Sequence, residues 1–78
     1  MMNDIDLIVK LIEDNIGDNN EVHISYELYN LIKEKILLYK GKQNIIGDTY
    51  VGNILLNNKT IKIYYNILYE FDEIEFKK

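Results

Sequence analysis

The chain has 78 residues, which is enough for one domain with one small hydrophobic core. It has no cysteine and a single histidine, so disulfides and thiolate metal sites are excluded and a metal would need carboxylate ligands. The net charge of −4 argues against binding a nucleic-acid backbone and favours a protein partner with a basic surface.

The first predicted element is an amphipathic helix over residues 4–16. Asn3 suits its N-cap, and Gly17 suits the left-handed position that ends a helix. The surrounding residues 1–24 carry six acidic side chains against Lys10 alone. The buried face has the helical spacing, and its members are Ile5, Ile8, Val9, Ile12 and Ile16, widened by Leu7 and Leu11.

A second helix is predicted over residues 26–40. A short extended segment at 22–24 precedes it, and Ser25 is a natural N-cap. Gly41 follows the last periodic residue and ends the helix. Its buried stripe has the helical period and contains Leu28, Leu31, Ile32, Ile36 and Tyr39.

From residue 42 onward the apolar period changes to two, which predicts strands. Gly47-Asp48 and Asn57-Asn58 are the expected tight turns. A two-residue turn at Asn57-Asn58 gathers the apolar residues on one face, whereas a three-residue turn mixes polar with apolar positions. A four-residue turn would leave the same residues on each face of the sheet, so it remains an alternative. The two-residue turn pairs Ile54 with Ile61, Gly52 with Ile63 and Tyr50 with Tyr65, and its core face continues through Ile67, Tyr69 and Phe71.

The alternation breaks near Asp72. The apolar residues of the core face before it have odd numbers from Ile61 to Phe71, whereas Ile74 and Phe76 after it have even numbers. This indicates either a bulge or a short additional strand. Helices followed by strands are typical of the α+β class. The sequence therefore predicts a single α+β domain over residues 1–78, with two N-terminal helices packed on one face of a three- or four-stranded antiparallel β-meander.

The sequence argues against catalytic, metal-binding and nucleic-acid-binding roles. His23 and Ser25 alternate on an extended segment and point to the same side, but a nucleophile also needs an orienting acid and oxyanion donors. The acidic stretch around Gly17 fails the EF-hand spacing, since Ile12 stands where an aspartate is required. We therefore expect no catalytic residue, no cofactor and no metal site. The best nucleic-acid candidate combines Lys33, Lys35, Lys40 and Lys42 with Tyr39, and the acidic total weighs against it.

The face of the sheet opposite the helices is the predicted partner surface. In the expected register Tyr64 lies there opposite Val51, with Leu55 and Leu68 nearby. Two helices cannot cover both faces, so this strip is either exposed or buried by a partner or a second copy of the chain. The predicted partner-binding residues are these four together with the acidic pair, Asp14 and Asp18.

The leading functional hypothesis is a non-enzymatic protein-binding module. Its specific form is a phage- or mobile-element-encoded inhibitor that blocks a basic nucleic-acid-binding surface of a host protein, because the composition favours residues with A/T-rich codons. The alternatives are a small dimeric nucleic-acid-binding regulator and a self-assembling structural protein. With no basic-apolar leader and no apolar run that could span a membrane, the expected location is the cytoplasm.

Overall fold

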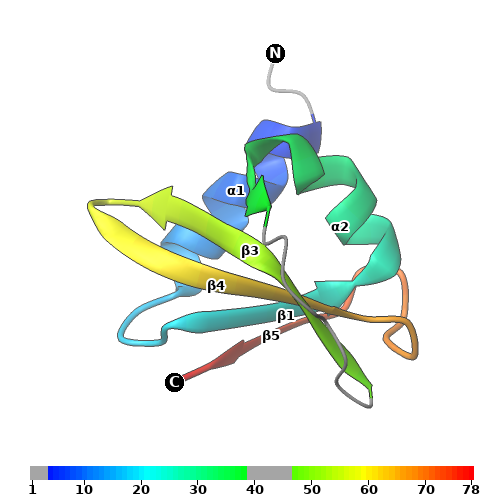
Figure 1. The fold of residues 1–78 in the computed structure, drawn as a ribbon. Helices are drawn as coiled ribbons and strands as arrows, with labels where there is room; N and C mark the ends of the chain where they lie inside the picture. Colours follow the sequence, from blue (N-terminus) through cyan, green and yellow to red (C-terminus); the bar gives the residue numbers. More distant parts are fainter. Residues whose placement is uncertain (1–3, 39–46) are drawn as a thin grey trace.

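A computed structural model describes residues 4–38 and 47–78 of the chain. Two helices lie on one side of a single sheet, which confirms the α+β class (Figure 1). In chain order the elements are α1 (Asp4–Asn15), β1 (Glu21–Ser25), α2 (Tyr26–Ile32), the 3-10 turn η1 (Lys33–Lys35), β2 (Leu37–Leu38), β3 (Asp48–Leu56), β4 (Lys59–Asn66) and β5 (Ile74–Lys77).

The sheet is mixed, so the predicted antiparallel meander is wrong. Its strand order is β2-β3-β4-β1-β5, with β1 parallel to β4 and antiparallel to β5. The segment expected only to lead into the second helix is thus a central strand. Val22 and Ile24 are both 0 % exposed, because strands flank them and the helices cover them. The short strand considered after Asp72 exists as β5, and it pairs with β1.

The β3–β4 hairpin confirms the two-residue turn. Asn57 and Asn58 have φ of 50° and 63°, the positive values that such a turn needs at both central positions. The expected pairs of Ile54 with Ile61 and of Gly52 with Ile63 are present.

A bulge in β3 changes the register beyond Gly52. The pairing shifts between Tyr50 and Gly52, so Tyr50 lies opposite Tyr64 and the predicted Tyr50–Tyr65 pair is wrong. Gly52 has a φ of 145°, a conformation open to glycine but rarely to other residues. The extra residue, Val51, is 2 % exposed and packs into the core. The bulge also reverses the side-chain directions of residues 48–50. It therefore determines which of these side chains lie on the uncovered face.

Both helices are shorter than predicted. α1 ends at Asn15, with Ile16 in the turn that follows, and α2 ends at Ile32 rather than at residue 40. Ile36 is still buried, but its backbone is extended because the next two residues pair with β3. The predicted end of this helix at residues 39–41 and the strand at 45–46 lie outside the described residues.

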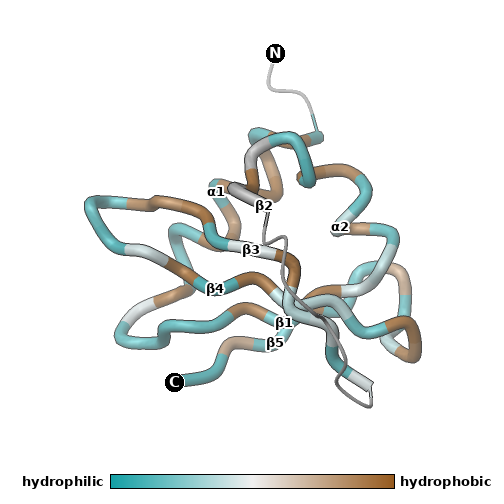
Figure 2. Tube along the Cα trace, in the orientation of Figure 1, coloured by the Kyte–Doolittle hydropathy of each residue, from teal (hydrophilic) through white to brown (hydrophobic). Residues whose placement is uncertain are grey.

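The core lies between the two helices and one face of the sheet. Apolar and polar positions alternate along β3 and β4, as expected when only one face is covered (Figure 2). No helix among the described residues is long and apolar enough to cross a membrane. The core residues are Ile12, Ile16, Val22, Ile24, Leu28, Ile32, Ile36, Val51, Ile54, Leu56, Ile61 and Ile63.

Candidate protein-binding site

The uncovered face of the sheet is built around His23. This side chain from β1 is only 4 % exposed although neither α1 nor α2 covers it. Its ring stacks on that of Tyr64 in the neighbouring strand β4, with 4.4 Å between centroids and an interplanar angle of 1°. Tyr50 packs on the other side of the pair, 5.3 Å from Tyr64. The β3 bulge places Tyr50 there, since an unbroken register would have turned it toward the helices.

Two carboxylates flank the imidazole. Glu21 Oε1 lies 3.1 Å from His23 Nε2, and Asp48 Oδ1 lies 3.3 Å from Nδ1. The second contact is electrostatic, because Nδ1 has no partner in hydrogen-bond geometry. Because a carboxylate only accepts hydrogen bonds, Nε2 is the nitrogen that donates, and its acceptor is Glu21. Glu21 and Asp48 therefore hold the His23 ring in place between them.

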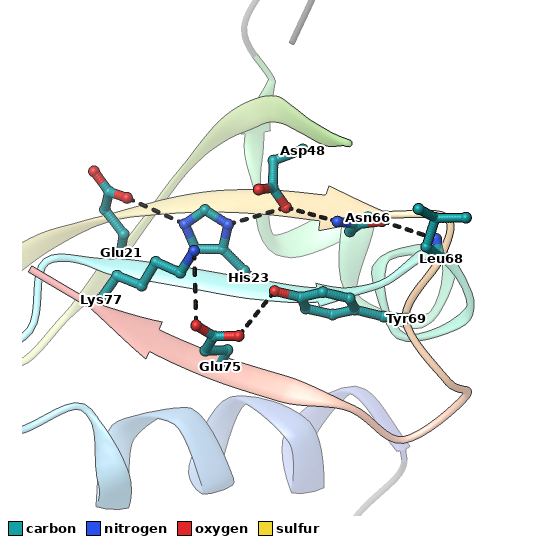
Figure 3. A network of polar contacts seen from close by, with 8 residues as sticks. All are labelled: Glu21, His23, Asp48, Asn66, Leu68, Tyr69, Glu75 and Lys77. Carbon is teal, nitrogen blue, oxygen red and sulfur yellow. Dashed lines mark hydrogen bonds and ion pairs between the residues drawn. The ribbon is translucent and has the colours of Figure 1, made fainter. Parts of the chain in front are cut away.

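This cluster extends by hydrogen bonds into the segment after β4 (Figure 3). Asn66 Nδ2 donates to Asp48 Oδ1 at 3.2 Å, and the Leu68 backbone N–H donates to Asn66 Oδ1 at 2.8 Å. The residues that surround His23 thus fix the start of the connection to β5. We call residues 67–73, which form that connection, the 67–73 loop.

A second contact fixes the middle of the 67–73 loop. The Tyr69 hydroxyl donates to Glu75 Oε2 at 3.1 Å, and Lys77 Nζ lies 3.6 Å from Glu75 Oε1 (Figure 3). Burial, the hydrogen bond to Glu75 and the nearby carboxylates raise the pKa of Tyr69 from 10.0 to about 12. Its hydroxyl therefore stays protonated, and able to donate, well above neutral pH.

Ser25 fixes the far end of the same loop. This residue is 0 % exposed, and its Oγ accepts a bond from Leu28 N–H at 3.1 Å, which confirms the predicted helix cap. The same hydroxyl donates to Phe71 O at 2.6 Å, and the Ser25 N–H donates to Glu73 O at 3.2 Å. Two backbone groups thus occupy the hydroxyl, and it joins the start of α2 to the 67–73 loop.

The 67–73 loop presents apolar side chains to solvent. Ile67, Leu68 and Phe71 are 71 %, 81 % and 65 % exposed. In Figure 2 the part of the loop directly after β4 is brown although it projects from the edge of the molecule. Apolar groups gathered on one surface segment mark interaction sites more often than scattered ones. The exposed carboxylates between and beside them are Glu70, Asp72 and Glu73.

A shallow pocket lies beside this loop. It has a volume of about 300 Å³ and is lined by Gly47, Thr49, Tyr65, Ile67 and Leu68. The Tyr65 ring of this lining packs edge-on against Tyr26 of α2, with 5.1 Å between the ring centroids. The pocket therefore has a lining of aliphatic and aromatic side chains beside a glycine and a threonine.

The predicted apolar strip is not one continuous surface. Tyr64 and the 67 %-exposed Leu55 do lie on the uncovered face, as expected. Leu68 lies in the loop beyond the sheet, and Val51 belongs to the core. The prediction that Val51 lies on the uncovered face is wrong, because the bulge turns its side chain toward the helices.

The predicted acidic pair lies away from the loop. Asp14, near the end of α1, is exposed and lies 3.7 Å from Lys10, and Asp18 is exposed in the turn before β1. Figure 1 shows this turn and the 67–73 loop at opposite ends of the sheet. The structure therefore does not bring Asp14 and Asp18 together with Leu68.

Sequence reasoning missed Asp48, Ile67 and Phe71 as parts of a surface. The regular alternation of residues 63–71 suggested a longer strand, whereas β4 ends at Asn66. The available signal was Gly52, since a glycine inside a strand often marks a bulge. A bulge there would have predicted the reversal of residues 48–50.

Comparison with protein-family models, curated proteins and solved structures finds no match to this chain.

Proposed function

We propose that the chain is a protein-binding module that docks through its 67–73 loop onto a partner surface combining an apolar depression with basic side chains. The observation that carries the proposal is the placement of Ile67, Leu68 and Phe71, each more than three-fifths exposed, in one loop fixed at both ends. Such side chains gain free energy when a partner removes them from water.

Burial of these side chains would contribute a substantial part of the free energy of binding. Burying an apolar side chain fully is worth about 1.5–3 kcal/mol, so three mostly exposed ones supply roughly 3–6 kcal/mol. The loop also holds its shape by internal bonds, including Glu73 N–H to Glu70 O at 2.9 Å and Glu70 N–H to Glu73 Oε1 at 3.1 Å. Less ordering is then required on association, which raises affinity.

The charges around the apolar side chains select a basic partner. Glu70, Asp72 and Glu73 are exposed, and they attract lysine and arginine side chains during the encounter. Lysine and arginine are also the residues with which proteins bind nucleic-acid phosphates. The specific form of the proposal is an inhibitor, encoded by a phage or mobile element, that covers a nucleic-acid-binding surface of a host protein.

A selection from a library of displayed random peptides tests this function. The immobilised wild-type chain should enrich peptides that place lysine or arginine beside leucine or an aromatic residue. The double variant Leu68→Ser, Phe71→Ser should not retain those peptides. The matched control is Leu55→Ser, which removes a comparably exposed leucine from β3 and should retain them.

Two results would overturn the proposal. One is enrichment of acidic peptides or of no peptide class. The other is equal retention by the loop variant and the wild type, provided that both unfold at similar temperatures.

A further inference from the structure

The outer edge of β5 has no partner among the described residues. β5 is the last strand in the sheet order and pairs only with β1. The Ser25 N–H bonds to Glu73 O and the Asn20 N–H bonds to Lys77 O, so the odd-numbered carbonyls point toward β1. The N–H and C=O groups of Ile74 and Phe76 therefore point outward, because these groups alternate in direction along a strand.

The side chains of this edge alternate in character. Ile74 and Phe76 are half-buried and pack against the core, while Glu75 and Lys77 lie on the uncovered face. Charged residues on an edge strand usually prevent pairing with another chain. Glu75 and Lys77 have opposite charges at alternate positions of β5. They therefore prevent pairing with a second chain only in those registers that place like charges opposite each other.

We propose that β5 pairs antiparallel with β5 of a second copy, with Phe76 on the two-fold axis, to form one continuous sheet. A two-fold antiparallel pair places one residue opposite itself. A two-fold axis at Glu75 or at Lys77 would place that residue opposite the same charge in the second copy. An axis at Ile74 would place Glu73 opposite Glu75. Only the register centred on Phe76 puts Glu75 opposite Lys77, and it does so twice.

The backbone polarity fits the same register. With Phe76 on the axis, its outward N–H and C=O groups bond to those of the second Phe76. Glu75 and Lys77 then form the non-hydrogen-bonded pairs, in which opposing side chains lie closest. Each half-buried Phe76 loses further exposed surface against its counterpart. Because the paired segment is only four residues long on each side, the dimer should be weak.

Sedimentation equilibrium of the full chain and its charge variants tests the register. The wild type should show a reversible monomer–dimer equilibrium. Glu75→Lys alone and Lys77→Glu alone should each weaken the dimer about tenfold, since each creates two like-charge pairs in place of two opposite ones. Glu34→Lys, an exposed change on η1, is the matched control and should leave dimerisation unchanged.

Mixing the two single variants gives the decisive result. The two lysines of the Glu75→Lys chain would face the two glutamates of the Lys77→Glu chain, so the mixture should dimerise about as tightly as the wild type, whereas each variant alone dimerises about tenfold more weakly. The double variant should dimerise by itself for the same reason. A wild type that stays monomeric into the millimolar range, or variants that do not complement each other, would overturn the proposal. These measurements need no docking partner, so they are independent of the proposed function.

Discussion

Replacing Ser25 by alanine should weaken the helix cap and release the 67–73 loop at the same time. The hydroxyl accepts from the buried Leu28 N–H and donates to Phe71 O. Loss of an N-cap side chain costs about 1 kcal/mol, and loss of the second hydrogen bond costs about 0.5–1.5 kcal/mol. We therefore expect the free energy of unfolding to fall by about 2 kcal/mol, which lowers the melting temperature of a domain of this size by roughly 8–16 °C.

Urea unfolding, monitored by circular dichroism, measures the fall in the free energy of unfolding. Amide hydrogen exchange measures the release of the 67–73 loop. Exchange at residues 67–73 should accelerate more than exchange along β3. Thr60→Ala, an exposed change on β4, is the control and should stay within about 0.5 kcal/mol of wild type. A loss below about 0.5 kcal/mol for Ser25→Ala, with unchanged exchange in the loop, would refute the role assigned to this hydroxyl.

Three further outcomes follow from the same contacts. Because the pKa of Tyr69 is raised to about 12 in the folded chain by burial and by its bond to Glu75, its contribution to stability is complete below pH 10.0 and is lost as the pH rises toward 12. Urea titrations across this range should show a shallower alkaline decline for Tyr69→Phe, and identical declines would contradict this assignment. Val51→Ala should cost about 1–2 kcal/mol of unfolding free energy while Leu55→Ala stays within about 0.5 kcal/mol, and equal costs would argue against the bulge. Reversing the acidic residues of the 67–73 loop to lysine should slow association with a basic peptide and reduce its salt dependence, whereas a rate insensitive to salt in the wild type would rule out electrostatic steering.

The sequence predicted the elements whose signals are local. Ser25 caps a helix, Gly17 has the positive φ expected after one, and Asn57-Asn58 forms the two-residue turn. Each of these depends on the conformational preference of one or two residues. The pairing of Ile54 with Ile61 also follows from the turn and the period of two, because a one-residue slip would expose the core face.

The topology could not be read in the same way. β1 is a five-residue strand whose neighbours, β4 and β5, lie far along the chain, and no local pattern encodes that pairing. A pattern of period two also continues past Asn66, although the chain turns there because the Asn66 side chain binds the Leu68 N–H. The candidate site was missed for the same reasons, since it is built from that turn and from residues that the bulge reorients.

The central claim is that the 67–73 loop is the docking surface, and chemical-shift mapping tests it most directly. An isotope-labelled sample of the full chain is titrated with a basic-apolar peptide obtained from the display selection. We predict that the largest backbone shifts lie in residues 67–73 and at Thr49 and Tyr65, which line the adjoining pocket. A twin peptide with glutamate in place of every lysine and arginine should produce no shifts. Largest shifts on α1 or at the β3–β4 turn, with the 67–73 loop unperturbed, would contradict the assignment of this loop as the docking surface.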